Sequence, residues 1–214
     1  MNAIFHAGAG VALGALALGP EATPADLALC AAAGTSPDWD GLLLLSGRPL
    51  YSRFHRAATH GLVGLAAGAL LAGGILSLWG GWSFGRAAGL WLLAAAGHTA
   101  SDLFNRSGVV LLHPFSSERT RFPAVSWASP LLTLGACATA LGAYLASGGT
   151  RLVAVAGVAG YAVHLRRRLR EPVLQDALSR WWFERMCGGP FHPYGEAPLE
   201  AAPGVSAESW RERA

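Results

Sequence analysis

The sequence contains no lysine, and its sixteen basic residues are all arginines. Charged residues make up only 14% of the 214 residues, whereas an ordinary soluble domain carries about 25%. Hydrophobic residues make up 52%, and the mean hydropathy is +0.36. The shortage of charge excludes a typical water-soluble protein and predicts that lipid is part of the solvent of this chain. The length suits one compact domain.

Cysteine is scarce as well. Cys30, Cys137 and Cys187 lie far apart and form no C-x-x-C motif, and an odd count argues against a disulfide framework. We interpret them as small apolar packing residues. No basic residue precedes Arg48, so the apolar N-terminus lacks the charged start of a signal peptide and is expected to be retained. Nucleic-acid binding is not predicted, because the arginines cluster where membrane topology would place them.

Long apolar runs predict an all-α fold, a multi-helix integral membrane bundle. Residues 2–19 form the first run, and a second helix, with Thr23 as cap and Pro24 at its first position, runs to about Gly34. These two helices are short for a full span of about 20 residues, so they are expected to form a short hairpin. The full spans are expected at residues 60–80, 84–105, 124–147 and 150–165.

The arginines predict how the chain lies in the membrane. If the 60–80 helix begins inside, most loop arginines lie inside too, which is the usual bias. They are Arg48, Arg53, Arg56, Arg106, Arg119, Arg121 and the cluster at 166–170. We therefore expect a membrane-embedded domain over residues 1–170, with its inner loops in the cytoplasm. Residues 171–214 are expected to form an amphipathic interfacial helix, at 172–186, and a loosely ordered tail.

Histidines and aspartates lie where the apolar runs begin or end. His98 and Asp102 are four residues apart on a predicted helix, so they share one face and can chelate one cation or bind two adjacent ones. An aspartate inside an apolar helix is costly unless it is paired or bound to metal. A buried His–Asp hydrogen bond that joins two helices is an equally open interpretation.

Two further motifs precede this pair. Asp38 and Asp40 follow the second helix, and only a turn or two metal ions would let both carboxylates serve one site; solvated acids in a turn are the plainer interpretation. His55 and His60 flank the start of the 60–80 span. Arg56 lies four residues before His60, so it can join the helix N-terminal amides in an anion site. Snorkelling of Arg56 and an interfacial role for His60 are the alternatives.

In an up-and-down bundle all of these side chains reach one end. His6, near the start of the first helix, and His113, in the loop after Asp102, are expected at the same end. Imidazoles and carboxylates together suit Zn²⁺ or a similar divalent ion. Such an ion lowers the pKa of a bound water to near neutrality, and Arg56 would offset phosphate charge.

The order of these motifs resembles a family of membrane-bound, metal-dependent hydrolases, also described as LexA-binding, inner membrane-associated hydrolases. The resemblance covers roughly residues 1–125 and implies a multi-pass inner-membrane protein with a metal site that hydrolyses phosphoesters or phospholipid-like substrates. The sequence departs from the family at Gly41, where a histidine is common, and at His113, where an aromatic residue is frequent. The matching residues are His6, Pro37-Asp38-Trp39-Asp40, His55-Arg56, Thr59-His60, His98, Asp102, Asn105, Gly108 and Pro114-Phe115-Ser116.

These arguments predict a metal-dependent hydrolase at the cytoplasmic face, holding one to three divalent ions, with Zn²⁺ or Mn²⁺ as candidates. The expected partners are the lipid bilayer and a small-molecule or lipid phosphoester. A non-enzymatic membrane protein with a structural His/Asp cluster and a haem-binding membrane protein are the competing hypotheses. The main ligands are predicted to be His6, Asp38, His60, His98 and Asp102, with Asp38, His60 and Asp102 as catalytic residues, Asp40, His55 and His113 as further ligands, Arg56 as the substrate-binding residue, and Thr59 and Asn105 as residues that orient ligands.

Overall fold

The computed structural model describes residues 2–47, 51, 54–105, 107–122, 129–145 and 150–170. Within these ranges the chain is helical, apart from turns and an antiparallel bridge between Val109 and Thr120. The all-α prediction is therefore confirmed for the described part of the chain. The interfacial helix and tail expected after residue 170, with Cys187, lie outside the described residues.

Six α-helices and two 3₁₀ helices make up this part of the structure. The helix boundaries lie within a few residues of those expected from the apolar runs. The elements are α1 (Ala3–Leu18), η1 (Gly19–Glu21), α2 (Pro24–Thr35), η2 (Ser36–Ser46), α4 (Leu62–Trp79), α5 (Phe84–Asp102), α6 (Pro130–Leu145) and α7 (Thr150–Arg170).

The start of α2 is fixed by the residues that the sequence singled out. The Oγ1 of Thr23 accepts a hydrogen bond from the backbone of Asp26 at 3.2 Å, and the Asp26 carboxylate accepts one from the Thr23 backbone at 2.9 Å. This reciprocal capping box confirms Thr23 as the cap and Pro24 as the first helical residue. The same carboxylate also accepts hydrogen bonds from Arg86 and Trp82, so it ties α2 to the beginning of α5.

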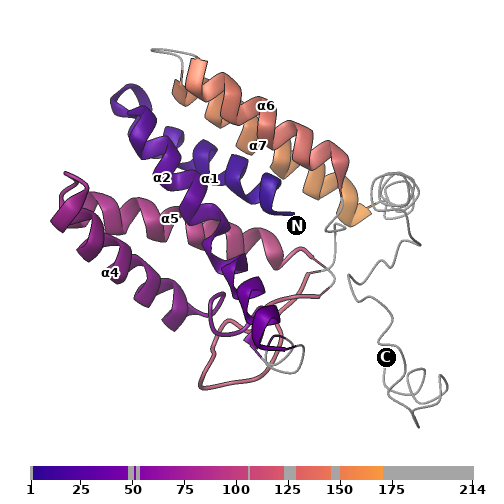
Figure 1. Ribbon diagram of the computed structural model, residues 1–214. Helices are drawn as coiled ribbons and strands as arrows, with labels where there is room; N and C mark the ends of the chain where they lie inside the picture. Colours follow the sequence, from indigo (N-terminus) through magenta and orange to yellow (C-terminus); the bar gives the residue numbers. More distant parts are fainter. Residues whose placement is uncertain are drawn as a thin grey trace, which may run out of the picture.

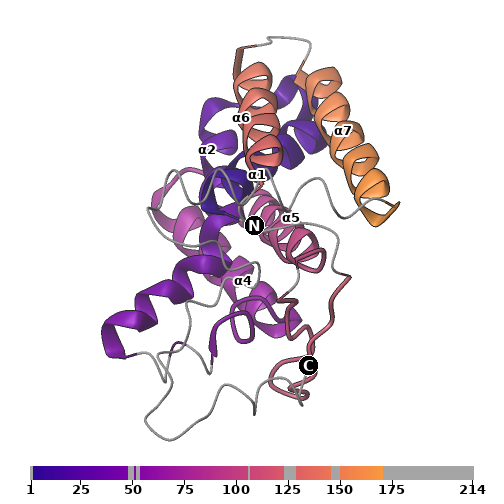
Figure 2. The ribbon, with the colours of Figure 1, turned by 90° about the vertical axis from the view of Figure 1, so that its right-hand side faces the viewer.

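The helices form three hairpins, α1/α2, α4/α5 and α6/α7. Helix α1 lies at the centre, where it contacts α2, α5, α6 and α7 (Figure 1). The views in Figures 1 and 2 both place α4 and α6 on different sides of the α1/α2 hairpin. The α6/α7 hairpin therefore packs on α1, whereas the α4/α5 hairpin reaches α1 and α2 through α5.

Small residues let α1 and α2 approach closely. A Cβ atom at Gly10 would overlap the carbonyl oxygen of Cys30, and one at Gly34 would lie 2.5 Å from the carbonyl oxygen of His6. Cys30 is buried at this contact, as expected for a small packing residue, whereas Cys137 is exposed. The close contact holds the first turns of α1 against the end of α2, which leads directly into η2.

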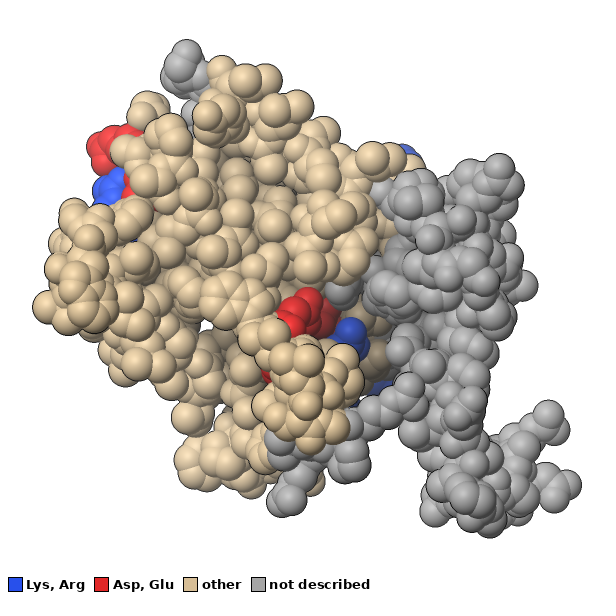
Figure 3. All heavy atoms as spheres, in the orientation of Figure 1, with Lys and Arg blue, Asp and Glu red and all other residues tan. Residues whose placement is uncertain are grey.

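Two helical segments are long and apolar enough to cross a membrane, Ala3–Glu21 and Leu62–Trp79. The first segment corrects the expectation that the N-terminal helix is too short, because η1 continues α1 to a length of 19 residues. Helix α4 exposes large apolar side chains along its length, among them Leu70, Leu71 and Leu78. The face shown in Figure 3 is mostly uncharged, with charged side chains visible in a few small groups.

The other expected spans correspond to helices that are too short or too polar to qualify as membrane-crossing segments. Helix α5 has the length, but Arg86, His98 and Asp102 lower its hydropathy. Helix α6 begins at Pro130, not at residue 124, and is 16 residues long. Helix α7 ends in an arginine cluster. Within the described residues, the candidate spans are therefore α4, at an expected position, and α1 with η1, and the other three expected spans are not confirmed.

Candidate metal centre

One end of the bundle gathers polar side chains from four separate segments. They come from the first turns of α1, from η2, from the turn at residues 55–60 and from the last turns of α5. Four of these side chains, from three of the segments, place one ligand atom each within 4.8 Å of one another. They are Asp38, His60, His98 and Asp102.

The distances within this group are short and similar. The Nε2 atoms of His60 and His98 lie 3.1 Å apart. The Asp38 Oδ1 atom lies 3.6 Å from each of them, and the Asp102 Oδ2 atom lies 3.8 Å from His60 Nε2 and 3.9 Å from His98 Nε2. The two histidines and Asp102 are buried, and the Asp38 side chain is 26% exposed. The group could hold a metal ion.

The backbone of α2 fixes the tautomer of His98. The Nδ1 atom of His98 lies 2.7 Å from the carbonyl oxygen of Gly34. A carbonyl oxygen can only accept, so Nδ1 carries the proton and donates it. In the neutral ring, Nε2 then presents a lone pair toward His60 and the two carboxylates.

The tautomer of His60 is set by a chain of two hydrogen bonds. The hydroxyl of Thr59 donates its one proton to Asp40 Oδ2 at 3.2 Å and lies 3.1 Å from His60 Nδ1. The hydroxyl must therefore accept from Nδ1, which leaves a lone pair on Nε2. Burial lowers the pKa of His60 below its ordinary value, so the ring is neutral near pH 7.

With their Nδ1 protons committed elsewhere, the two rings direct their Nε2 atoms at each other across 3.1 Å. A proton or a metal ion between these nitrogens makes the contact attractive, and the two carboxylates favour such a positive charge. Two nitrogens bound to Zn²⁺ at about 2.0–2.1 Å in a tetrahedral site lie about 3.3 Å apart, close to the observed distance. Metal-bound histidines also commonly donate their second ring N–H to a carbonyl or similar group, as His98 does. The donor set therefore fits a divalent cation.

His6 extends the group on the side of α1. Its ring stacks on His98, with centroids 3.6 Å apart, and its Nε2 atom lies 3.4 Å from Asp102 Oδ1. The Ser101 hydroxyl donates to the His98 carbonyl oxygen and lies 3.3 Å from His6 Nδ1, so it accepts from that atom. His6 Nε2 therefore also presents a lone pair. The two oxygens of Asp102 face different histidines.

Asp40 does not belong to the group of four residues. Its carboxylate binds the turn at residues 55–60. It is buried and accepts hydrogen bonds from the Arg56 backbone, the Thr59 hydroxyl and His55 Nδ1, the last at 3.0 Å. The 3₁₀ geometry of η2 explains the division, because residues two apart on such a helix point in different directions. Asp38 thus faces the histidine pair, while Asp40 organises the turn that carries His60.

Arg56 brings a positive charge to the mouth of the site. Its Nε atom lies 3.7 Å from Asp102 Oδ2, and its side chain is 13% exposed. Its φ of 60° is a conformation that non-glycine residues rarely adopt. The His55 side chain, 26% exposed, lies nearby through Asp40. The site therefore reaches the surface beside Asp38, His55 and Arg56, whereas its far side is closed.

The comparison with known families agrees with the apolar character of the chain. Residues 1–170 match the model of the YdjM inner membrane protein family. The chain belongs to this family. Together with the two apolar helices, the family assignment indicates an inner membrane protein. No curated protein and no solved structure matches the chain.

Two predicted site residues of this YdjM-family protein lie apart from the group of four. The His113 ring packs edge-to-face on Phe54, with centroids 6.5 Å apart. His113 was predicted as a further ligand, but it is not among the four residues whose ligand atoms lie close together. A Cβ at Gly41, where a histidine is common in the similar family, would meet no atom within 4 Å. Asn105 is buried just beyond Asp102, and its backbone donates to the Asp102 carbonyl oxygen at 3.0 Å.

Two groups that orient the histidines were missed in the sequence. The Gly34 carbonyl oxygen is a backbone atom, so no side chain signals its role. Ser101 could have been noticed, because it follows His98 by three residues and directly precedes Asp102. Its hydroxyl links the last turn of α5 to His6 of α1.

Proposed function

We propose that this protein is a metal-dependent hydrolase that cleaves phosphoesters at the cytoplasmic face of the inner membrane. The observation that carries the proposal is the pair of Nε2 lone pairs, 3.1 Å apart, between two carboxylates. Hydrogen bonds to Gly34 and Thr59 hold both rings in the tautomer that a metal requires.

The donor set favours Zn²⁺, with Mn²⁺ as the alternative, because it mixes imidazole nitrogens with carboxylate oxygens. Bound in this group, the ion would supply a water of lowered pKa and would polarise a phosphoryl oxygen. His6 Nε2 and Asp102 Oδ1 lie 3.4 Å apart and could hold a second ion.

Residues around the proposed ion would orient the water, bind the substrate and hold the site in place. Asp38 lies at the mouth, where its partly exposed carboxylate can orient a water and accept its proton. Arg56 lies beside the group, where its guanidinium can bind the anionic phosphoryl group of a substrate. Asp40, through Thr59 and His55, holds the turn in place. The positions of Arg56 and Asp38 favour a substrate that enters from the surface with its anionic group first.

We also propose a multi-pass topology with the site on the cytoplasmic side. Arg119 and Arg121 lie in the loop after α5, and Arg166 and Arg167 lie near the end of α7. Leu165 of α7 packs beside Phe5 of α1, so the end of α7 is at the same end of the bundle as His6. An excess of arginine at this end is typical of the cytoplasmic side.

Metal analysis and an activity panel test the proposal. Purified wild-type protein is expected to contain about one to two Zn²⁺ or Mn²⁺ per chain and to hydrolyse at least one of a panel of phosphomonoesters and phosphodiesters. His98→Gln and Asp102→Asn should lower both metal content and activity, whereas His113→Gln, outside the group, should change neither. Wild-type protein that binds no divalent ion would contradict the proposal, and metal without hydrolysis would favour a structural cluster.

The geometry argues against the haem hypothesis for the central pair. Axial histidines bind iron from opposite faces of a porphyrin, whereas His60 and His98 direct their Nε2 atoms into one group with two carboxylates. The absence of Soret absorbance in the purified protein would agree with this argument.

A further inference from the structure

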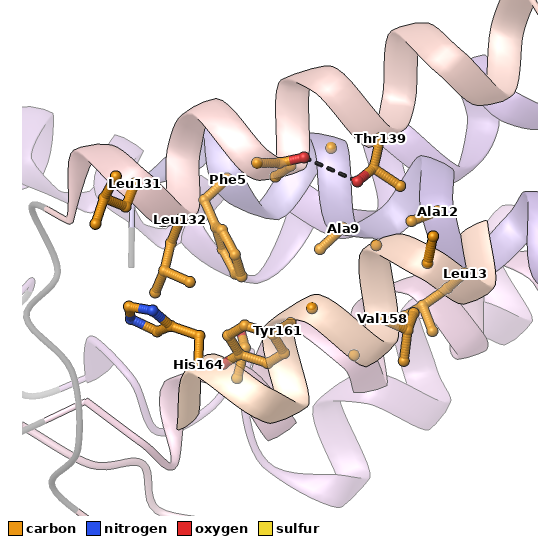
Figure 4. A pocket seen from close by; sticks show the side chains of 18 of the residues that line it. Phe5, Ala9, Ala12, Leu13, Leu131, Leu132, Thr139, Val158, Tyr161 and His164 are labelled. Carbon is orange, nitrogen blue, oxygen red and sulfur yellow. Dashed lines mark hydrogen bonds between the residues drawn. The ribbon is translucent and has the colours of Figure 1, made fainter. Parts of the chain in front are cut away.

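A second feature of the protein is an apolar groove beside the metal centre. It has a volume of about 550 Å³ and lies between α1, α5, α6 and α7 (Figure 4). This volume is within the range of about 300–1,000 Å³ that is usual for ligand sites. Residues that line it include Phe5 and Ala9 of α1, Leu132 and Gly135 of α6, and Gly160 and Tyr161 of α7.

The groove is open along one side. Gly135 and Gly160 both line it, both are exposed, and a Cβ atom at either position would meet no atom within 4 Å. The two glycines therefore leave free space where larger side chains would fill the groove. Since the family assignment indicates an inner membrane protein, a membrane lipid is an apolar molecule available to enter the groove through this opening.

One end of the groove is polar. Tyr161 and His164 lie together there, next to Leu132 (Figure 4). Within the described part of the chain the buried Tyr161 hydroxyl has no hydrogen-bond partner. A buried hydroxyl without a partner is costly, so a ligand that offers an acceptor oxygen at this end would stabilise it.

The polar end adjoins the metal centre through shared residues. The Phe5 ring lies 5.6 Å from Tyr161 and 5.4 Å from His6, centroid to centroid. Ser101 lines the groove and also accepts the hydrogen bond from His6 Nδ1. One layer of side chains therefore separates the groove from the predicted ligands.

We infer that the groove holds one acyl chain of a membrane lipid, with an ester or phosphate oxygen of that lipid at Tyr161, at the end of the groove that adjoins the metal centre. The inference rests on the proposed hydrolase function and names its substrate class as a lipid phosphoester. An apolar groove that ends in a hydroxyl and an imidazole matches the chemistry of an acyl chain joined to a polar headgroup.

Photo-crosslinking in vesicles tests the acyl-chain site directly. The full chain is placed in phosphatidylglycerol vesicles that contain phosphatidic acid with a diazirine on one acyl chain, and adducts are mapped by mass spectrometry. We expect adducts on the groove residues of α1, α6 and α7. Gly160→Leu should reduce them by about tenfold, because its side chain displaces roughly two methylene groups of the ligand. Gly89→Leu, at another exposed glycine with free space around it, should not.

Three outcomes would overturn the inference. Adducts spread evenly over the exposed face of α4, or groove adducts unchanged by Gly160→Leu, would show that no acyl chain is bound there. Groove adducts absent from the full chain but present after removal of residues 171–214 would show that the chain itself occupies the groove.

Hydrolysis measured in parallel separates this inference from the proposed function. Gly160→Leu should lower kcat/KM for long-chain phosphatidic acid about tenfold and leave a short, water-soluble phosphoester and the metal content unchanged. Groove-specific adducts without hydrolysis of any phosphoester would refute the proposed function and leave the acyl-chain site in place. Hydrolysis without groove-specific adducts would support the proposed function and refute the acyl-chain site.

Discussion

Thr59 shows how a single hydroxyl can determine what a histidine offers to a metal. Its proton is committed to Asp40, which is buried and has two other donors. The hydroxyl oxygen can therefore only accept from His60, and the ring is left with its lone pair on Nε2. Thr59 was predicted to orient a ligand, and these hydrogen bonds give that prediction a physical basis.

Replacing Thr59 tests that role. Thr59→Val removes the hydroxyl with little change in shape, so we expect metal affinity to fall about 10–100-fold, as is usual when a group that orients a ligand is lost. Thr59→Ser keeps the hydroxyl and should restore most of the affinity. Competition with a chromophoric chelator measures the affinities. Equal loss in both variants would indicate a packing role.

The residue pattern predicted which side chains gather, but not how they divide the work. The spacing of His98 and Asp102 in the sequence placed them on one helix face. The other site residues were expected beside them because an up-and-down bundle brings the ends of its helices together. The sequence ranked Asp38 above Asp40 as a ligand, and the 3₁₀ form of η2, which was not predictable from its residues, gives the physical reason for their separation. His113 was expected at the same end of the bundle, but the long loop after α5 did not indicate which residues it would contact.

Individual helices depend on close contacts that the sequence only hinted at. Gly34 is at once the contact point of α2 with the backbone of His6 and the source of the carbonyl that orients His98. Any side chain at this position pushes α1 away from the site.

Gly34→Ala is therefore expected to lower the free energy of unfolding by about 1–3 kcal/mol through overpacking and to reduce metal content, because His6 and His98 both shift. Gly89→Ala, at an exposed helical position with open space, should leave both quantities nearly unchanged or slightly raise stability. Thermal unfolding in detergent and metal analysis provide the measurements. Full metal content in Gly34→Ala would contradict the assigned role of the contact.

The junction of α2 with α5 depends on a buried carboxylate. Hydrogen bonds from Arg86 hold the pKa of Asp26 well below its ordinary value, against the effect of burial. The charged form is favoured in the folded state, so its contribution to stability is present above the ordinary pKa of about 3.9 and is lost as the pH falls below that value.

Asp26→Asn should lower the free energy of unfolding by about 2 kcal/mol at pH 7, since it removes charge-assisted hydrogen bonds. The difference from wild type should shrink as the pH falls below about 4. Glu21→Gln is the control, because it removes a nearby negative charge that acts on Arg86 but no described hydrogen bond, since Arg86 donates to the backbone carbonyl of Glu21. A difference that stays constant with pH would show that the Asp26 charge is not involved.

At the scale of the whole molecule, the positions of the helices could be predicted far better than their packing. Apolar runs marked each helix to within a few residues, except that α6 begins later than expected. The central place of α1 could not be inferred, because helices that are apolar on all sides give no sign of which face meets which neighbour. The number of spans was overestimated where Arg86, His98 and Asp102 interrupt α5.

Removing the metal should weaken the whole bundle. The centre joins η2, the turn before α4 and α5, so a bound ion stabilises the folded state by about 2.7 kcal/mol at a free concentration one hundred times its Kd. Treatment with a chelator should lower the Tm in detergent, and restoring Zn²⁺ should return it. Asp102→Asn protein should show a much smaller change. A Tm that does not respond to the chelator would mean that no ion contributes to stability.

The location of His6 has a consequence for how the protein is made. Asn2 holds the beginning of α1 through its contacts with the Phe5 backbone and Thr133, so the first residues of the chain are already committed to a place in the bundle. Yet the partner of His6 is Asp102, which the ribosome adds much later. If the proposed ion binds here, its site is complete only after α5 has emerged, and residues added directly before Asn2 are expected to disturb it.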